Sequence, residues 1–179
     1  QEDAVVMVAY LHQDARDDES LQAATQKAVD ILYQISEQVK LNEKQVGVAY
    51  NVDDLIYLKN AGKKAIFLAI ENGYAIGKDL GNLSMFKDMG ITYITLCHNG
   101  SNDICDSAKG EPEHNGLSPF GRKVVKEMNR LGIIIDISHT SVKTVQDVLE
   151  LSTAPIIASH SSSRALCDHP RNLTDDQIL

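Results

Sequence analysis

The sequence of 179 residues lacks the features that mark membrane-spanning or secreted chains. None of its apolar runs approaches the about 20 residues that a helix needs to cross a bilayer, and its N-terminus does not resemble a signal peptide. It also has no run of basic residues, and its formal net charge is -8. Because nucleic acids and anionic membrane surfaces attract basic patches, we expect neither as a partner.

Sequence motifs of several common protein classes are also absent. Cys97, Cys105 and Cys167 form no Cys-x-x-Cys pair, so a disulfide is neither required nor excluded. We expect a soluble protein, and its compartment, cytoplasm or periplasm, stays open. No Gly-x-Gly-x-x-Gly or Walker loop follows a predicted strand, which argues against a nucleotide-binding sheet. There is no Gly-x-Ser-x-Gly element either. Ser159 and His160, as neighbours on an extended segment, point to opposite faces and make a poor nucleophile and base.

Strand-like and helix-like segments alternate along the chain. The length and the hydrophobic content of 43% predict one globular domain, residues 1–179. Short apolar runs predict strands at residues 4–11, 45–50, 65–70, 91–96, 133–137 and 156–159. Capping residues and helical spacing predict helices at residues 83–89 and after Ser20, Asp53, Ser118, Ser141 and Thr174. This alternation predicts an α/β fold with parallel strands, either a (β/α) barrel or a doubly wound sheet.

Four polar side chains stand at the ends of four successive predicted strands: Glu71, His98, His139 and His160. The carboxyl ends of parallel strands meet at one edge, where ligands bind. One histidine at a strand end is more often a structural residue, but two in adjacent units, each flanked by hydroxyls, favour a shared site. A carboxylate and neutral imidazoles suit a zinc-type site that activates water. The residues therefore predict a metal-dependent hydrolase, and a barrel fragment with incidental histidines is the alternative.

Other polar residues have structural interpretations. We expect His12 and His114 to be solvated loop residues and Cys97 to be a buried small side chain. Asp136 lies inside a predicted strand, where a buried carboxylate needs partners, so it could orient a ligand of the site. The long polar loop at residues 99–117 has no periodicity, which is typical of active-site loops.

Several segments of the chain resemble the membrane (renal-type) dipeptidase family. They are Asp136-Ile137-Ser138-His139, Ser159-His160-Ser161-Ser162, His169-Pro170-Arg171-Asn172, Glu71-Asn72-Gly73, Leu96-Cys97-His98-Asn99 and Gly116-Leu117-Ser118-Pro119-Phe120-Gly121. Members of that family are binuclear zinc enzymes on a TIM-like barrel. The resemblance spans nearly the whole chain, so it implies a metal-dependent dipeptidase domain with a TIM-like (β/α) barrel.

The resemblance also implies a role for each site residue. Glu71 corresponds to the carboxylate that bridges both zinc ions, and His139 and His160 correspond to the imidazoles that complete one of them. His98 corresponds to the histidine that stabilises the oxyanion of the tetrahedral intermediate, so Glu71 and His98 are the implied catalytic residues. Arg171 corresponds to the arginine that binds the carboxyl-terminal side of the substrate, and His98 and Arg171 are thus the implied substrate-binding residues.

Two parts of the family's active site have no counterpart among the segments that carry the resemblance. The His-x-Asp pair that holds most of the other zinc belongs to a first barrel strand, and the aspartate that handles the proton of the leaving amine would lie beyond Leu179. The resemblance therefore implies an incomplete barrel of about five of the eight strands, the second to the sixth. The loop at residues 100–104 and Asn72 also differ from many relatives, so the preferred dipeptides stay open.

An open sheet exposes unpaired backbone groups and apolar side chains, so we expect this chain to self-associate or to pair with missing barrel segments. We expect the complete protein to hydrolyse dipeptides with a zinc-activated water, and the short chain alone to be nearly inactive. Another metal-dependent amidohydrolase-type barrel enzyme, such as a lactonase or a deaminase, and a non-catalytic fragment are the alternatives.

Overall fold

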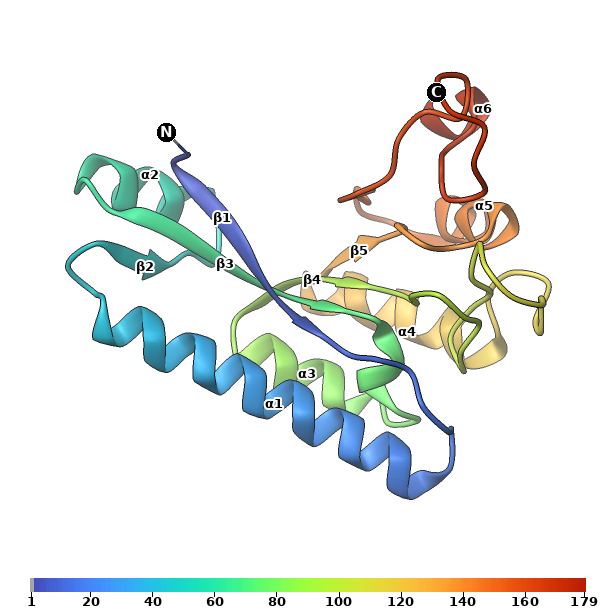
Figure 1. The fold of residues 1–179 in the computed structure, drawn as a ribbon, viewed down its shortest axis with the longest axis horizontal. Coiled ribbons are helices and arrows are strands. Elements are labelled where there is room, and N and C mark those ends of the chain that lie inside the picture. Colours follow the sequence, from blue (N-terminus) through green and yellow to red (C-terminus); the bar gives the residue numbers. More distant parts are fainter. Residues whose placement is uncertain (1) are drawn as a thin grey trace.

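The computed structural model describes residues 2–179 and shows a five-stranded parallel sheet with helices packed along one face (Figure 1). Within these residues no helix has both the length and the apolar character needed to cross a bilayer. The elements in chain order are β1 (Ala4–Tyr10), α1 (Asp18–Leu41), β2 (Val46–Val48), α2 (Val52–Asn60), β3 (Lys64–Glu71), the 3-10 helix η1 (Gly73–Ile76), α3 (Gly81–Asp88), β4 (Ile91–Thr95), α4 (Pro119–Leu131), β5 (Ile134–Asp136), α5 (Val142–Leu151) and α6 (Asp175–Ile178).

The sheet is organised around β3. One edge of β3 pairs with β1, in a register that runs from Ala4 opposite Ala65 to Tyr10 opposite Glu71. The other edge pairs first with β2 and then, from Leu68 onward, with β4, which in turn pairs with β5. Every pair is parallel, which confirms the predicted α/β fold. The carboxyl ends of β1, β3, β4 and β5 therefore lie along one edge of the sheet.

The predicted strand at residues 156–159 forms only an isolated parallel bridge between Ile157 and Asp136. Two backbone hydrogen bonds of 2.9 Å hold Ile157 there, one from its N–H to Ile135 O and one to its carbonyl from Ile137 N–H. The ladder stops on both sides for local reasons. Pro155 has no N–H to donate, and the N–H of Ser159 is bound by the Asp136 side chain instead of by a strand. The prediction of a full strand was wrong, although the segment lies beside β5 as expected.

Two predicted helix caps were also displaced by three and two residues. α1 is capped by Asp17, which accepts from the N–H of Ser20 at 2.9 Å, so Ser20 lies inside the first turn. α2 is capped by Asn51 and not by Asp53, which instead places a negative charge in the first turn of that helix. The predicted cap of α5, Ser141, is confirmed, and it accepts from the N–H of the residue three positions later.

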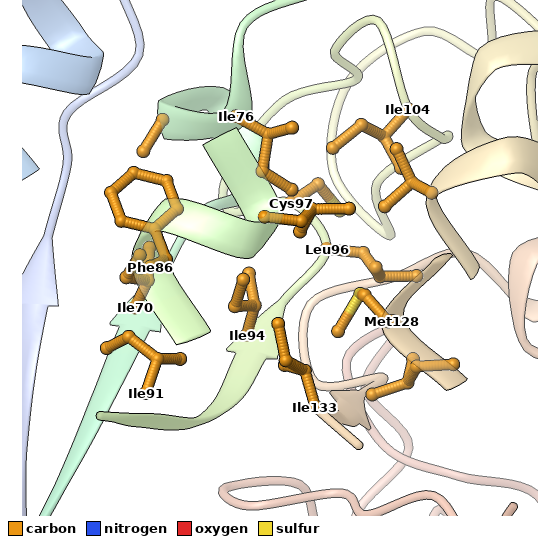
Figure 2. Packing of buried hydrophobic residues seen from close by; sticks show 14 of the residues in the cluster. Ile70, Ile76, Phe86, Ile91, Ile94, Leu96, Cys97, Ile104, Met128 and Ile133 are labelled. Atoms are coloured by element: carbon orange, nitrogen blue, oxygen red, sulfur yellow. The ribbon is translucent and has the colours of Figure 1, made fainter. Parts of the chain in front are cut away.

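The helices α1, α3 and α4 bury one face of the sheet. Along β3, Ile66, Leu68 and Ile70 alternate toward this face and join one core with side chains of α1, α3 and α4. Figure 2 shows Ile70 beside Phe86 of α3, with Met128 of α4 further along the same core. Each fully buried side chain of this size contributes about 1.5–3 kcal/mol, so this face provides a rigid platform for the strand ends.

The opposite face of the sheet is partly open. α2 covers its amino-terminal end, where Leu58 packs against Ala49 and Ala65. Beyond α2, Val6 and Ile134 keep 39% and 40% of their surface exposed. A hollow of about 340 Å³ opens here and is lined by Val6, Tyr50, Asn51, Val52, Phe67, Lys87, Thr92, Tyr93, Gly132, Ile134 and Ile157. This face therefore carries apolar surface that residues 2–179 do not cover.

Candidate functional site

The four predicted strand-end groups meet at the carboxyl edge of the sheet. Glu71 is the last residue of β3 and not the first one after it, because its backbone still pairs with both neighbouring strands. His98 and His139 stand at the third position after β4 and β5, and His160 stands at the third position after the bridge at Ile157. This common offset brings the three imidazoles to the same edge as the carboxylate.

The ligand atoms of three of these residues are close together. Glu71 Oε1 lies 3.3 Å from His139 Nε2 and 3.3 Å from His160 Nε2, and the two nitrogens are 2.9 Å apart. His98 stands beside this group, with its Nε2 3.6 Å from Glu71 Oε1 and its ring centroid 4.1 Å from that of His139. Glu71, His139 and His160 thus form a group that could hold a metal ion.

The three separations fit the ligands of one small cation. Bonds of about 2.0–2.1 Å in a tetrahedral zinc site place neighbouring ligand atoms about 3.3 Å apart. Both Glu71–imidazole separations equal that value, and the separation of 2.9 Å between the imidazole nitrogens is slightly shorter. Lone pairs converging so closely repel one another unless a proton or a cation lies among them. A carboxylate with two imidazoles is also a donor set that zinc accepts.

The electrostatic environment favours an ionised carboxylate and a neutral His98. The pKa of Glu71 is lowered, chiefly because His139 hydrogen-bonds to it; burial acts in the opposite direction, and the charges of His160 and His98 lower it further. The pKa of His98 is lowered too, first by burial and then by repulsion from His139. Near neutral pH the site therefore presents one negative charge and a neutral imidazole beside it.

His139 is held in an uncommon backbone conformation. Its φ of 70° lies in the left-handed region, which costs a non-glycine residue about 1–3 kcal/mol. Its carbonyl accepts from Ala108 N–H at 2.7 Å and from the Ser107 hydroxyl at 3.2 Å. The same hydroxyl lies 2.6 Å from the carbonyl of His98. Ser107 therefore ties together the two segments that carry His98 and His139, a role that the sequence did not reveal.

The loop at residues 99–117, predicted as an active-site loop without regular structure, is organised by Asp106. The Asp106 side chain is only 1% exposed. Its Oδ1 accepts from the N–H groups of Glu113 at 2.7 Å and His114 at 3.0 Å, and its Oδ2 accepts from Gly116 N–H at 2.8 Å. The backbone carbonyl of Asp106 also accepts from Ser141 N–H at 2.9 Å, which joins the loop to the start of α5.

Arg171 lies next to the metal-binding group. One of its Nη atoms donates to the carbonyl of His160 at 3.2 Å. Its pKa is lowered, first by burial, while the negative charge of Glu71 acts in the opposite direction. An arginine with its high intrinsic pKa stays charged in such surroundings, so a guanidinium stands beside the three ligand atoms.

Other residues weighed in the sequence lie outside this group. His12 is exposed, as expected, and although His12-Gln13-Asp14 reads His-x-Asp after β1, neither acid nor imidazole belongs to the group of ligand atoms. Cys97 is fully buried, as expected. His114 is not a solvated residue, because its Nε2 lies 2.7 Å from Asn102 O and its side chain is only 21% exposed. The loop folds back on itself and so provides this partner.

Sequence reasoning missed one aromatic residue at the site. The ring of Tyr10 contacts His98 edge-on, with the centroids 4.9 Å apart and the planes at 66°. Tyr10 is paired in register with Glu71, so both side chains leave the sheet on the same face. The sequence contained a signal for Tyr10, because aligning the carboxyl ends of the first and third predicted strands places it close to Glu71.

Comparison with known proteins agrees with this architecture. A model of the membrane dipeptidase family (Peptidase family M19) matches residues 1–179. The chain is 41% identical over 152 residues to dipeptidase tcpJ of Claviceps purpurea, a match that covers 84% of this chain and 35% of that protein. The structure of the probable dipeptidase PvdM from Pseudomonas aeruginosa is similar with a TM-score of 0.85 and 35% identity, over 90% of this chain and 42% of PvdM.

An amidohydrolase from Pseudomonas aeruginosa is also similar, with a TM-score of 0.87 and 27% identity over 98% of this chain and 50% of that one. The chain therefore spans between 35% and 50% of the length of these proteins, and its fold is part of a TIM-like barrel. Because the family model covers all 179 residues and its relatives share the fold as well as the sequence, the chain belongs to the membrane dipeptidase family.

Proposed function

We propose that the complete protein that contains this chain is a zinc-dependent dipeptidase. The observation that carries the proposal is the convergence of Glu71 Oε1, His139 Nε2 and His160 Nε2 to separations of 2.9–3.3 Å at the carboxyl edge of the sheet, in a chain of the membrane dipeptidase family. A metal-dependent hydrolase needs this combination, namely a cation site at the edge where the loops of a barrel gather.

Glu71, His139 and His160 are the residues that would hold zinc. When bound, zinc would lower the pKa of a water molecule toward neutrality and so supply the nucleophile for peptide hydrolysis. Glu71 contributes a carboxylate whose lowered pKa keeps it available as a ligand near neutral pH. Its second carboxylate oxygen would be available to a second zinc, whose remaining ligands we assign to barrel segments outside this chain. Two cations sharing one carboxylate require two free oxygens, which an ionised glutamate offers.

His98 and Arg171 would act on the substrate. His98 is neutral and stands 3.6 Å from Glu71 Oε1, so its N–H could stabilise the negative charge that develops on the carbonyl oxygen of the scissile peptide. The Arg171 guanidinium is held by the His160 carbonyl through one nitrogen, which leaves its other donors for the terminal carboxylate of a dipeptide.

We further propose that residues 1–179 form a partial domain whose open apolar face is covered, in the complete protein, by the remaining barrel strands. The face with Val6 and Ile134 exposed, and the 35% share of a full-length relative that this chain represents, support this interpretation. We expect the isolated chain to self-associate through this face and to be nearly inactive. Sedimentation of the isolated chain as a compact monomer with a cooperative melting transition would contradict this expectation.

The experiment that tests the function uses the complete protein. Zinc content is measured by mass spectrometry for the wild type and for a His139→Ala, His160→Ala double variant, and hydrolysis is measured on dipeptides with L- or D-residues at the carboxyl end. We expect zinc and chelator-sensitive hydrolysis in the wild type and a loss of both in the double variant. The His12→Ala variant is the matched control, because His12 is a strand-end histidine outside the group of ligand atoms.

Two results would contradict the proposal. A zinc-loaded wild type that hydrolyses no dipeptide would exclude the dipeptidase activity and would make lactones and other amides the next substrates to test. A double variant that keeps its full zinc content would show that the ligands are elsewhere. A loss of zinc in His12→Ala would point to the His12-Gln13-Asp14 segment as part of the metal site.

A further inference from the structure

The second ring nitrogen of His160 has a hydrogen-bond partner. His160 Nδ1 lies 2.7 Å from the hydroxyl of Ser159, and that hydroxyl lies 2.7 Å from Oδ2 of Asp136. Asp136 is fully buried at the end of β5, whereas the side chain of His160 is 42% exposed. A row of three polar groups therefore leads from the interior of the sheet to an exposed imidazole whose other nitrogen faces Glu71.

The partners of Asp136 determine where the protons lie. Its Oδ2 also lies 2.6 Å from the hydroxyl of Thr95, and its Oδ1 accepts from the N–H groups of Ser138 at 3.0 Å and Ser159 at 2.9 Å. Four donors converging on two oxygens is the arrangement of an ionised carboxylate, which accepts only. The single hydrogen of the Ser159 hydroxyl then points to Asp136, so the lone pair of that oxygen faces His160 Nδ1, which must carry a hydrogen.

We propose that Ser159 is a positioning residue, whose hydroxyl connects Asp136 to His160 and fixes the imidazole in the tautomer with hydrogen on Nδ1 and a lone pair on Nε2. The inference rests on the proposed function, in which that Nε2 is a zinc ligand. A histidine that binds a metal through one nitrogen is commonly oriented through the other, and such partners strengthen metal binding. His160 Nε2 lies 3.3 Å from Glu71 Oε1 and 2.9 Å from His139 Nε2. Because His139 hydrogen-bonds to Glu71, it supplies the proton among these three atoms in the metal-free site, and His160 Nε2 can keep its lone pair.

The different exposure of the two histidine side chains explains why His160 needs a hydrogen-bond partner to orient it. The ring of His139 is only 4% exposed, so packing restricts its rotation. The side chain of His160 is 42% exposed, so packing restricts its ring less than that of His139. Fixing a mobile ring that can adopt either tautomer would cost conformational entropy on metal binding. The bond to Ser159 removes both freedoms.

Asp136 has a second effect that a test must separate from the first. By accepting from the N–H groups of Ser138 and Ser159, it joins the two segments that carry His139 and His160. The N–H of His160 in turn donates to the Ser138 hydroxyl at 3.0 Å. Substitution of Asp136 would disturb the backbone of both segments, whereas Ser159→Ala removes only the hydroxyl and keeps the backbone bond to Asp136. Ser159 is therefore the residue to change.

The test uses the complete protein in its metal-free form. Nitrogen-15 NMR of the histidine side chains reports directly which ring nitrogen of His160 carries the hydrogen. We expect the Nδ1–H tautomer in the wild type and a shift toward the Nε2–H tautomer in Ser159→Ala. Ser159→Thr retains the hydroxyl and should restore the wild-type tautomer. Ser162→Ala, which removes the hydroxyl of an exposed serine two positions beyond His160, should change nothing.

Zinc affinity, measured by competition with a chromophoric chelator, provides the second reading. We expect Ser159→Ala to bind zinc about 10–100-fold more weakly than the wild type, the range typical for the loss of a partner behind a metal ligand. An Nε2–H tautomer in the wild type, or an unchanged zinc affinity in Ser159→Ala, would overturn the proposal. The wild-type spectrum tests the predicted tautomer of His160 even if the Ser159→Ala variant fails to fold. A protein with the Nδ1–H tautomer but no zinc affinity would refute the proposed function and leave the role of Ser159 intact.

Discussion

Removing the charge of Asp106 should destabilise the loop that supports the metal-binding group. In Asp106→Asn the side chain keeps its shape, but one of its two oxygens becomes an NH2 group. Both oxygens of Asp106 accept from backbone N–H groups, Oδ1 from Glu113 and His114 and Oδ2 from Gly116. Either orientation of the amide therefore points a donor at a backbone donor, and rotation of the side chain gives no relief.

The magnitude follows from these three bonds. Hydrogen bonds to a charged acceptor contribute about 1.5–3 kcal/mol each and neutral ones about 0.5–1.5 kcal/mol, so losing one charged bond (about 2 kcal/mol) and weakening two others (about 1 kcal/mol each) costs about 4 kcal/mol. Solvent screening does not reduce this loss of unfolding free energy, because Asp106 is only 1% exposed. Urea unfolding of the complete, metal-free protein measures the difference, and Asp88→Asn, at an exposed aspartate of α3, is the matched control. A loss within about 0.5 kcal/mol of the control would refute the reasoning.

The dependence on pH offers an independent check. Burial raises the pKa of Asp106, but hydrogen bonds from the N–H groups of Gly116, Glu113 and His114 outweigh it, so the pKa lies below its ordinary value of 3.8. A carboxyl group with a lowered folded-state pKa stabilises the fold fully above its unfolded pKa and loses this contribution as the pH falls through the folded pKa. The difference between wild type and Asp106→Asn should thus be equal at about pH 7 and pH 5 and shrink below about pH 4. A difference that already shrinks between pH 7 and pH 5 would contradict the assignment.

Two further predictions concern packing and cysteine reactivity. A methyl group at Gly121 in α4 would overlap the carbonyl oxygen of Ile104, so Gly121→Ala should lower the unfolding free energy by about 3 kcal/mol. Gly100→Ala is the control and should have little effect, because its methyl group would meet only a side chain at 3.6 Å. Urea unfolding of both variants measures the difference. Burial raises the pKa of Cys105 well above its ordinary value, and Cys167 is exposed, so iodoacetamide should modify Cys167 in the native protein and Cys105 only after unfolding. Mass spectrometry of the labelled peptides gives the result, and equal labelling of both would contradict the buried position of Cys105.

The placement of the candidate site could be predicted from the sequence because it depends on strand ends. Apolar runs identify where each strand stops, and parallel pairing then aligns those ends without any knowledge of side-chain contacts. Glu71, His98, His139 and His160 were accordingly expected to meet, and the structure brings them together. Their roles as ligands and catalytic groups stay predictions, because the geometry supports them without testing them.

The parts that could not be predicted depend on contacts between loops. Nothing in the sequence around Ser107 indicates that its hydroxyl reaches the carbonyls of His98 and His139, which are 9 and 32 residues away. Asp106 likewise resembles any loop aspartate until the chain folds back on it. The helix caps were missed for a different reason. Asp17 and Ser20 are both good capping residues within one turn, so capping preference alone does not distinguish them, and the structure has Asp17 as the cap.

The two imidazoles of the candidate metal site are fixed by different means, and this difference sets what the site tolerates. His139 has a buried ring and a backbone in the left-handed region, held by Ala108 and Ser107 of the long loop. Changes at Ser107 or Ala108 therefore reach His139 through the backbone. His160 has a side chain that is 42% exposed, and the Ser159 hydroxyl orients its ring, while the Ser138 hydroxyl and Arg171 hold its backbone. Substitution of Ser107 should consequently displace one ligand together with the loop around it, whereas loss of the Ser159 hydroxyl would free the ring of the other ligand and keep the backbone bond from Ser159 to Asp136.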